Sequence, residues 1–181
     1  MIPTAEFIDT EDKARAILPY LFKQSQIGVD TETTGVRTFK DFVLFWSLAT
    51  RDRRFCLTSD VLPLFNDLLV SPRIDKVFTN SKFDRHMLAN SGVPNVGGNV
   101  ICTLVLDWLF DENRTGRHGL KECVWDHFGD RMPTFKEVFG KAVSEEKQSQ
   151  EMMRILLDPS TAFRAIDYSS RDAWETLRLA D

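Results

Sequence analysis

Two carboxylates lie two positions apart in an apolar stretch near the N-terminus. Residues 27–35 read IGVDTETTG, and the apolar first half predicts a short buried strand that carries Asp30 and Glu32. Since the side chains of a strand alternate between its two faces, both carboxylates point to the same face. Two acids on one face are costly unless a divalent cation, a basic partner or protonation of one acid offsets their repulsion.

Length and composition are those of an ordinary globular domain. Of the 181 residues, 43% are hydrophobic and 28% are charged, which predicts one domain over residues 1–181. No apolar run approaches the roughly 20 residues that span a bilayer. The N-terminus also lacks the pattern of a secretory signal. We therefore expect no membrane partner.

The cysteines and histidines form no recognisable metal motif. Cys56, Cys102 and Cys123 are an odd number without CxxC spacing, which predicts free thiols in a reducing compartment, the cytoplasm. The three histidines have no zinc-ligand spacing to them. The net charge of −4 argues against a broad basic surface for duplex binding. It does not exclude a nucleic-acid enzyme, because acidic ligands lower the formal charge and bound metal ions restore it locally.

Hydrophobic periodicity predicts a chain in which strands lead and helices dominate the second half. Short apolar runs predict strands that start at Ile27 and that cover residues 43–50, 54–57, 76–79 and 100–101. Helical spacing predicts helices at residues 10–23, 60–69, 81–90, 103–110, 120–127, 150–157 and 166–180. Residues 138–149 carry few apolar side chains and are expected to be mobile. This order predicts an α/β fold, with a mixed central sheet flanked by helices.

Two later stretches carry further acids at structured positions. Asn80 precedes the predicted helix at 81–90, and Asp84 falls in its first turns. Taken alone, Asn80 is a helix cap and Asp84 a favourable charge at the positive end of the helix. Tyr168 and Asp172 are four residues apart on the last predicted helix, and so share one face. Taken alone, such a pair is more often a solvated face than a site.

The three acidic stretches together are more specific than any one of them. VDTETTG, NSKFDRHML and YSSRDAWETL resemble the three exonuclease motifs of the DEDD superfamily in its tyrosine subtype. They are most similar to the proofreading domain of family A (polymerase I type) DNA polymerases, which residues 134–141, TFKEVFGK, also resemble. The resemblance runs from about residue 27 to the end, although residues 142–165 match no part of it. It implies a ribonuclease H-like, DnaQ-like exonuclease fold.

The resemblance implies a metal-dependent 3′–5′ exonuclease that releases nucleoside 5′-monophosphates from DNA 3′ ends. Two Mg²⁺ or Mn²⁺ ions would be held by four carboxylates, those of Asp30, Glu32, Asp84 and Asp172, since hard cations prefer oxygen ligands. It further implies that Tyr168 orients the attacking water and that Asn80 contacts the terminal nucleotides. The backbone amides of Thr31 and Thr33 would lie near the 3′ end. The implied partner is a single-stranded or frayed DNA 3′ end in a bacterial or virus-infected cell, with a polymerase lobe in trans or in a longer chain.

Three alternatives stay open at this point. The first is an RNA exonuclease of the ribonuclease D-like branch, because the motifs do not separate DNA from RNA. The second is a domain of the same fold that binds nucleic acid or a partner without catalysis. The third is an unrelated α/β protein whose acids are surface charge. In all of them, the sequence shows no basic residue at a fixed spacing that would neutralise Asp30 and Glu32, so we expect the counter-charge to come from solution.

Overall fold

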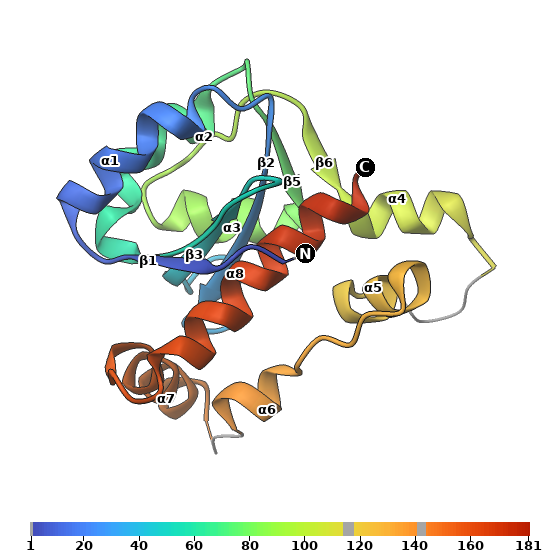
Figure 1. Cartoon of the computed structure of the whole chain (residues 1–181). Coiled ribbons are helices and arrows are strands. Elements are labelled where there is room, and N and C mark those ends of the chain that lie inside the picture. Colours follow the sequence, from blue (N-terminus) through green and yellow to red (C-terminus); the bar gives the residue numbers. More distant parts are fainter. Residues whose placement is uncertain (1, 114–117, 141–143) are drawn as a thin grey trace.

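A mixed six-stranded sheet forms the centre of the described part of the chain (Figure 1). The computed structural model describes residues 2–113, 118–140 and 144–181. The strand order is β1-β4-β3-β2-β5-β6. The strands are β1 (Ala5–Ile8), β2 (Gln26–Thr33), β3 (Val43–Ala49), β4 (Arg54–Thr58), β5 (Asp75–Phe78) and β6 (Val100–Cys102). The helices are α1 (Glu11–Leu21), the 3₁₀ helix η1 (Ser59–Phe65), α2 (Asn66–Val70), α3 (Ser81–Asn90), α4 (Thr103–Phe110), α5 (Leu120–Phe128), α6 (Phe135–Phe139), α7 (Glu145–Leu157) and α8 (Ala162–Leu179).

Strand β2 lies inside the sheet and links its antiparallel part to its parallel part. It pairs antiparallel with β3, where Asp30 lies opposite Ser47 and Glu32 opposite Phe45. Its N-terminal half pairs parallel with β5. The register shifts between Glu32 and Thr33, an irregularity of the kind that β-bulges introduce beside functional sites. The two acids therefore lie on regular strand, directly before the chain leaves the sheet.

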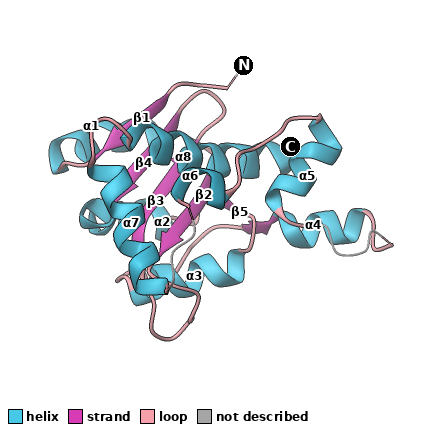
Figure 2. Ribbon diagram, turned by 90° about the horizontal axis from the view of Figure 1, so that it is seen from below, coloured by secondary structure: helices cyan, strands magenta, loops and turns pink. Residues whose placement is uncertain are grey.

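Two layers of helices bury the two faces of the sheet (Figures 1 and 2). On one face, α1, η1, α2 and α3 pack against a core that includes Ile27 and Val29 of β2. On the other face, α6, α7 and α8 pack around a second cluster that contains Phe45 and Tyr168. Because strand side chains alternate, Gly28, which lies between Ile27 and Val29, faces α8. Asp30 and Glu32 share that face.

The contact between β2 and α8 depends on Gly28. A β-carbon at this position would lie 2.1 Å from the backbone oxygen of Ala173, closer than a carbon atom can lie to an oxygen to which it is not bonded. The backbones of the strand and the helix therefore touch without an intervening side chain. Ser47 on β3 reinforces the contact, since its hydroxyl donates a hydrogen bond of 2.8 Å to the backbone oxygen of Ser169. This close approach places residue 172 beside residue 30.

Most predicted elements are confirmed, and the differences have local causes. The helices at 81–90 and 103–110 have the predicted bounds, and the strands after Ile27 agree to within two residues. The predicted helix at 60–69 is instead η1 followed by α2, since Pro63 lies inside it and cannot donate the backbone hydrogen bond of an α-helix. The last helix begins at Ala162 rather than at residue 166. The strand β1 was not predicted, because its four residues are few and form an edge of the sheet.

The segment at 138–149, which the sequence predicts to be mobile, is partly helical in the residues that the structure describes. Val138 and Phe139 end α6 and are buried. Helix α7 begins at Glu145, earlier than the predicted start at residue 150, and Ser144 caps it by accepting from the backbone of Lys147. Residues 141–143 lie outside the described part. No helix in the described part is both long and apolar enough to cross a membrane.

Candidate active site

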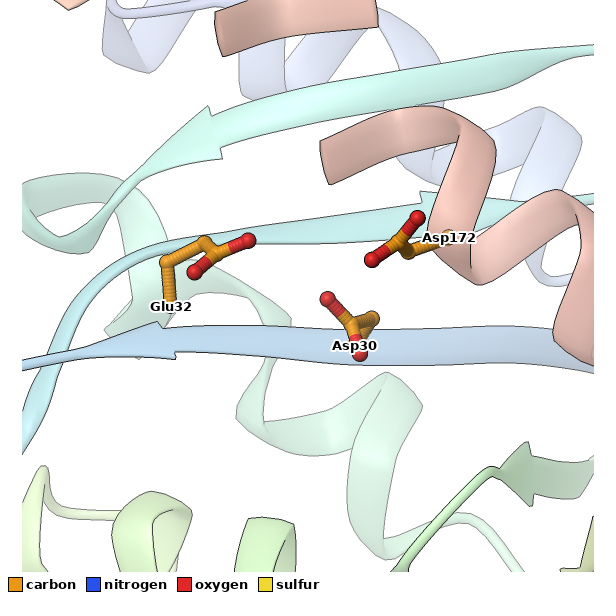
Figure 3. Close-up of side chains that lie close together, drawn as sticks. All are labelled: Asp30, Glu32 and Asp172. Atoms are coloured by element: carbon orange, nitrogen blue, oxygen red, sulfur yellow. The ribbon is translucent and has the colours of Figure 1, made fainter. Parts of the chain in front are cut away.

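Three of the predicted metal ligands converge at one point on the α8 side of the sheet. Carboxylate oxygens of Asp30, Glu32 and Asp172 all lie within 4.8 Å of one another. Figure 3 shows Asp30 and Glu32 on the strand and Asp172 on the helix, with their carboxylates turned toward one another. Glu32 and Asp172 are buried, and Asp30 is partly exposed. Residues 30 and 172 are 142 positions apart in the sequence, and the contact at Gly28 brings them together.

Asp84 reaches β2 from the opposite layer. It lies in the first turn of α3, and its carboxylate accepts a hydrogen bond of 2.7 Å from the hydroxyl of Thr31. Asp84 is outside the group of three acids, although its negative charge raises the pKa of Asp30 and of Glu32. The four acids therefore occupy both sides of the same end of β2.

The other predicted contact residues differ in what the structure shows of them. Asn80 precedes α3 as its N-cap residue, but its side chain makes no capping hydrogen bond. Thr33 donates its hydroxyl to the backbone oxygen of Gly35, 2.7 Å away, and so shapes the turn that follows β2. The hydroxyl of Thr31 is engaged with Asp84. Of these three residues, the side chain of Asn80 is therefore the best placed to meet another molecule.

Tyr168 lies one turn before Asp172 on α8 and is held by aromatic neighbours. The rings of Phe135 and Phe139 meet it edge-on, with centroids 6.4 and 5.4 Å from its own. Burial and the nearby carboxylates raise the pKa of its phenol above the ordinary value. The phenol is therefore protonated at neutral pH, which suits an orienting group rather than a base.

A lysine that the sequence argument did not identify completes the site. Lys121, the second residue of α5, donates from Nζ to Tyr168 Oη and to Asp172 Oδ2, each over 3.2 Å. The sequence shows no basic residue at a fixed spacing to Asp30 and Glu32, and the structure adds a positive charge that reaches the cluster through Asp172 instead. No spacing rule could have revealed the lysine, because 51 residues separate it from Asp172. The only signal was its place in residues 118–121, HGLK, at a helix start.

Burial makes the acids costly to ionise. Desolvation, followed by repulsion from Asp172, raises the pKa of Asp30 well above its ordinary value and that of Glu32 to about 8. Desolvation also raises the pKa of Asp84 to about 7 and that of Asp172 to about 6, in the latter case against the attraction of Lys121. Lys121 thus supplies only part of the positive charge that three buried carboxylates and the partly exposed Asp30 require. Convergent carboxylate oxygens that lack counter-charge are the donor set that hard divalent cations prefer, so the residues present fit such ions.

A cavity of about 470 Å³ opens beside Glu32. Its walls come from the turn after β2, including Thr33 and Val36, and from Phe135 on α6 and Met152 on α7. Ser149 of α7 donates a hydrogen bond of 2.9 Å to the backbone oxygen of Thr34, which fixes the helix against the turn. The cavity is thus a concave, partly apolar space at the edge of the acidic cluster, the kind of space in which ligands bind.

The sequence profile of 3′–5′ exonucleases matches residues 5–181, nearly the whole chain. The chain belongs to the 3′–5′ exonuclease family. It is therefore a nuclease, a hydrolase of phosphodiester bonds, and its membership agrees with the resemblance of the three acidic motifs. No curated protein matches the sequence significantly.

Solved structures show that this exonuclease has the DEDD exonuclease fold. The catalytic core of RRP6 from Trypanosoma brucei superposes with a TM-score of 0.73 at 17% identity, over 98% of this chain and 45% of that one. Escherichia coli RNase D gives 0.70 at 17% identity, over 99% and 44%. Brucella melitensis NrnC bound to pGG gives 0.71 at 19% identity, over 99% and 79%. The chain thus spans less than half of the RRP6 and RNase D chains, and most of the NrnC chain.

Proposed function

We propose that this exonuclease removes nucleotides from DNA 3′ ends by metal-dependent hydrolysis and releases nucleoside 5′-monophosphates. The observation that carries the proposal is the convergence of Asp30, Glu32 and Asp172 within 4.8 Å, with Tyr168 one turn away on α8. In hydrolysis, water adds to phosphorus, the bond to the 3′ oxygen of the preceding nucleotide breaks, and that oxygen takes up a proton. The nucleophile is a water molecule that must lose a proton. No described side chain of the acidic cluster is a base strong enough for that step, so the proton must be removed with help from another group.

The carboxylates would hold two Mg²⁺ or Mn²⁺ ions. Asp30, Glu32 and Asp172 form the closer set, and Asp84 would serve a second ion from the α3 side. Divalent ions bound there would lower the pKa of water and neutralise charge on the departing oxygen. Brucella melitensis NrnC, which shares the fold, has also been solved with bound Mg²⁺.

The chain's own residues would orient the substrate and the water. Tyr168, protonated at neutral pH, would hold the attacking water by a hydrogen bond. The cavity between Thr33, Val36 and Phe135 would take the terminal nucleoside. Asn80, at the start of α3, would contact the terminal nucleotides from the other helix layer. Two exposed aromatic side chains, Phe39 at 87% and Phe42 at about half, are candidates for stacking on bases, whereas Phe83 packs against the core.

RNA is the second candidate substrate. Escherichia coli RNase D is described as an exoribonuclease involved in structured RNA processing, and it shares this fold at a TM-score of 0.70. The resemblance of the three acidic motifs and of residues 134–141 to the proofreading domain of DNA polymerases favours DNA instead. On the same resemblance, the proposed partner is a polymerase lobe, in trans or in a longer chain. The proposed location is the cytoplasm, a reducing compartment in which the thiols of Cys56, Cys102 and Cys123 would stay reduced.

The deciding experiment compares labelled oligonucleotides of one sequence. Single-stranded DNA, matched duplex, duplex with a 3′ mismatch and RNA are incubated with Mg²⁺, with Mn²⁺ and with EDTA. We expect stepwise shortening from the 3′ end, faster on single-stranded and mismatched DNA than on RNA, and none in EDTA. Faster shortening of RNA would promote the second candidate. Shortening that persists in EDTA, or in Asp30→Asn with metal, would overturn the metal-dependent mechanism.

A further inference from the structure

Lys121 extends from α5 into the acidic cluster and contacts two of its residues at once. Its Nζ lies 3.2 Å from Tyr168 Oη, 3.2 Å from Asp172 Oδ2 and 3.4 Å from Asp172 Oδ1. The same nitrogen lies 4.5 Å from the centroid of the Tyr168 ring, within the range of a cation–π contact. Three-quarters of the lysine side chain is buried. A side chain that is this buried and has these partners is part of the site rather than of its solvated rim.

The hydrogen-bond chemistry of lysine fixes the orientation of its neighbour. An ammonium group has three donors and no acceptor. The oxygen of Tyr168 must therefore accept from Lys121, so its own hydroxyl hydrogen is directed elsewhere, toward Asp172 or toward another acceptor. Lys121 thus sets the direction in which Tyr168 donates, without touching a substrate itself. In this respect it acts as a positioning residue.

The charge of Lys121 does what a metal ion at the same carboxylate would do. The ammonium group lies 3.2 Å from Asp172 Oδ2, and Asp172 is in turn within 4.8 Å of the carboxylate oxygens of Asp30 and Glu32, so the lysine offsets part of their negative charge. A divalent ion that binds Asp172 needs the same oxygens. Two cations on one carboxylate repel each other, and the repulsion is strong where little water screens it.

Helix α5 packs mainly outside the two cores around the sheet. Its buried residues Leu120 and Val124 form a small separate cluster with Met132. A rearrangement of Lys121 on this helix would therefore be local, and local changes cost less than changes that open a central core.

We propose that Lys121 is the resident counter-ion of the metal site: it holds Asp172 and Tyr168 in place before metal binds, and a divalent ion must displace it from Asp172. This inference rests on the proposed function, since it takes the carboxylates as metal ligands. It adds a residue that sets how tightly the site binds metal. The lysine keeps the empty site folded and, by the same contact, weakens the affinity for metal.

The test measures metal binding and folding in the absence of nucleic acid. Lys121→Met removes the charge and keeps the length, Lys121→Gln keeps a donor for Tyr168 without the charge, and Lys121→Arg keeps the charge. Lys136→Met, at an exposed position on α6, changes the net charge equally and is the control. Each protein is titrated with MnCl₂ by calorimetry and melted in EDTA and in Mn²⁺, so that no reading depends on activity.

We expect Lys121→Met and Lys121→Gln to bind Mn²⁺ about tenfold more tightly than the wild type, or tighter still. Both variants should melt at a lower temperature than the wild type in EDTA, and added Mn²⁺ should raise their melting temperature by more than it raises that of the wild type. The Mn²⁺ affinity and the melting temperature of Lys121→Arg should stay close to those of the wild type, and those of Lys136→Met should match the wild type. If either neutral variant binds Mn²⁺ with unchanged or weaker affinity, Lys121 does not compete with metal, and this inference is overturned while the proposed function stands. If the wild type itself binds no Mn²⁺, both are overturned.

Discussion

Replacing Glu32 by glutamine should stabilise the metal-free protein while it removes the metal-dependent activity. Burial and the charge of Asp172 raise the pKa of Glu32 to about 8 from the ordinary 4.5. At neutral pH the folded protein therefore keeps a proton on Glu32 that the unfolded chain has lost. A glutamine side chain has the same shape and no charge, so the variant avoids that cost. The gain appears only without metal, because bound cations would offset the same repulsion in the wild type.

The size of the effect follows from linkage between protonation and folding. Because the pKa is higher in the folded state, the folded state binds more protons between pH 4.5 and pH 8, and stability falls as the pH rises through that window. At pH 7 the cost is about 3 kcal/mol, since each pH unit above the ordinary pKa is about 1.4 kcal/mol. Between pH 5 and pH 8 it grows by roughly 3 kcal/mol, or roughly 6–12 °C of melting temperature for a domain of this size.

The assay is a pair of thermal melts in EDTA at pH 5 and pH 8. A buried amide has its own cost, up to about 3 kcal/mol if it lacks a partner. That cost is the same at both pH values and cancels when the two differences between Glu32→Gln and wild type are compared. The control is Glu146→Gln, at an exposed position of α7. A difference in melting temperature that stays constant or shrinks from pH 5 to pH 8 would refute the reasoning.

Three further substitutions probe the site and its frame. Asp30→Asn should abolish hydrolysis and also the rise in melting temperature that millimolar Mg²⁺ gives the wild type; full activity in Mg²⁺ would sink the metal mechanism. Tyr168→Phe should lower kcat by roughly 10- to 100-fold and leave Mn²⁺ affinity within a few-fold; an unchanged kcat would count against its orienting role. Gly28→Ala should cost about 1–3 kcal/mol in a urea titration, because the β-carbon would meet Ala173; an unchanged midpoint would contradict the backbone contact.

The fold was largely predictable because its strongest signals are local. Alternation along residues 27–33 placed both acids on one face, and helical spacing fixed the bounds of α3 and α4. The failures lie where local signals are weak or ambiguous. Strand β1 is short and is stabilised by pairing with β4, which no local pattern reports. The start of α7 depends on a cap at Ser144 and on packing of Met152 and Leu156 against α8, and its first turns are polar.

The convergence of three acids was predictable from the sequence, whereas the contact of Lys121 with them was not. Asp30, Glu32, Asp84 and Asp172 were identifiable because three motifs recur together, and the structure brings three of them within 4.8 Å. Lys121 has no such motif. Its role depends on where α5 docks against α8, which is a matter of tertiary packing and not of sequence spacing. A positive charge that is so far from Asp172 in the sequence can be identified only when the positions of α5 and α8 in the fold are known.

The fold keeps the four carboxylates close together although they repel one another. Repulsion among the four carboxylates, whose pKa values are raised, destabilises the packing of β2 against α3 and α8. Other contacts must therefore stabilise the fold there. The apolar clusters on the two faces of the sheet and the direct contact at Gly28 provide that support, and Lys121 reduces the repulsion where α8 meets it. Substitutions that weaken the frame and those that neutralise the acids should therefore act oppositely on stability while both reduce hydrolysis. That opposition separates a structural defect from the loss of a metal ligand.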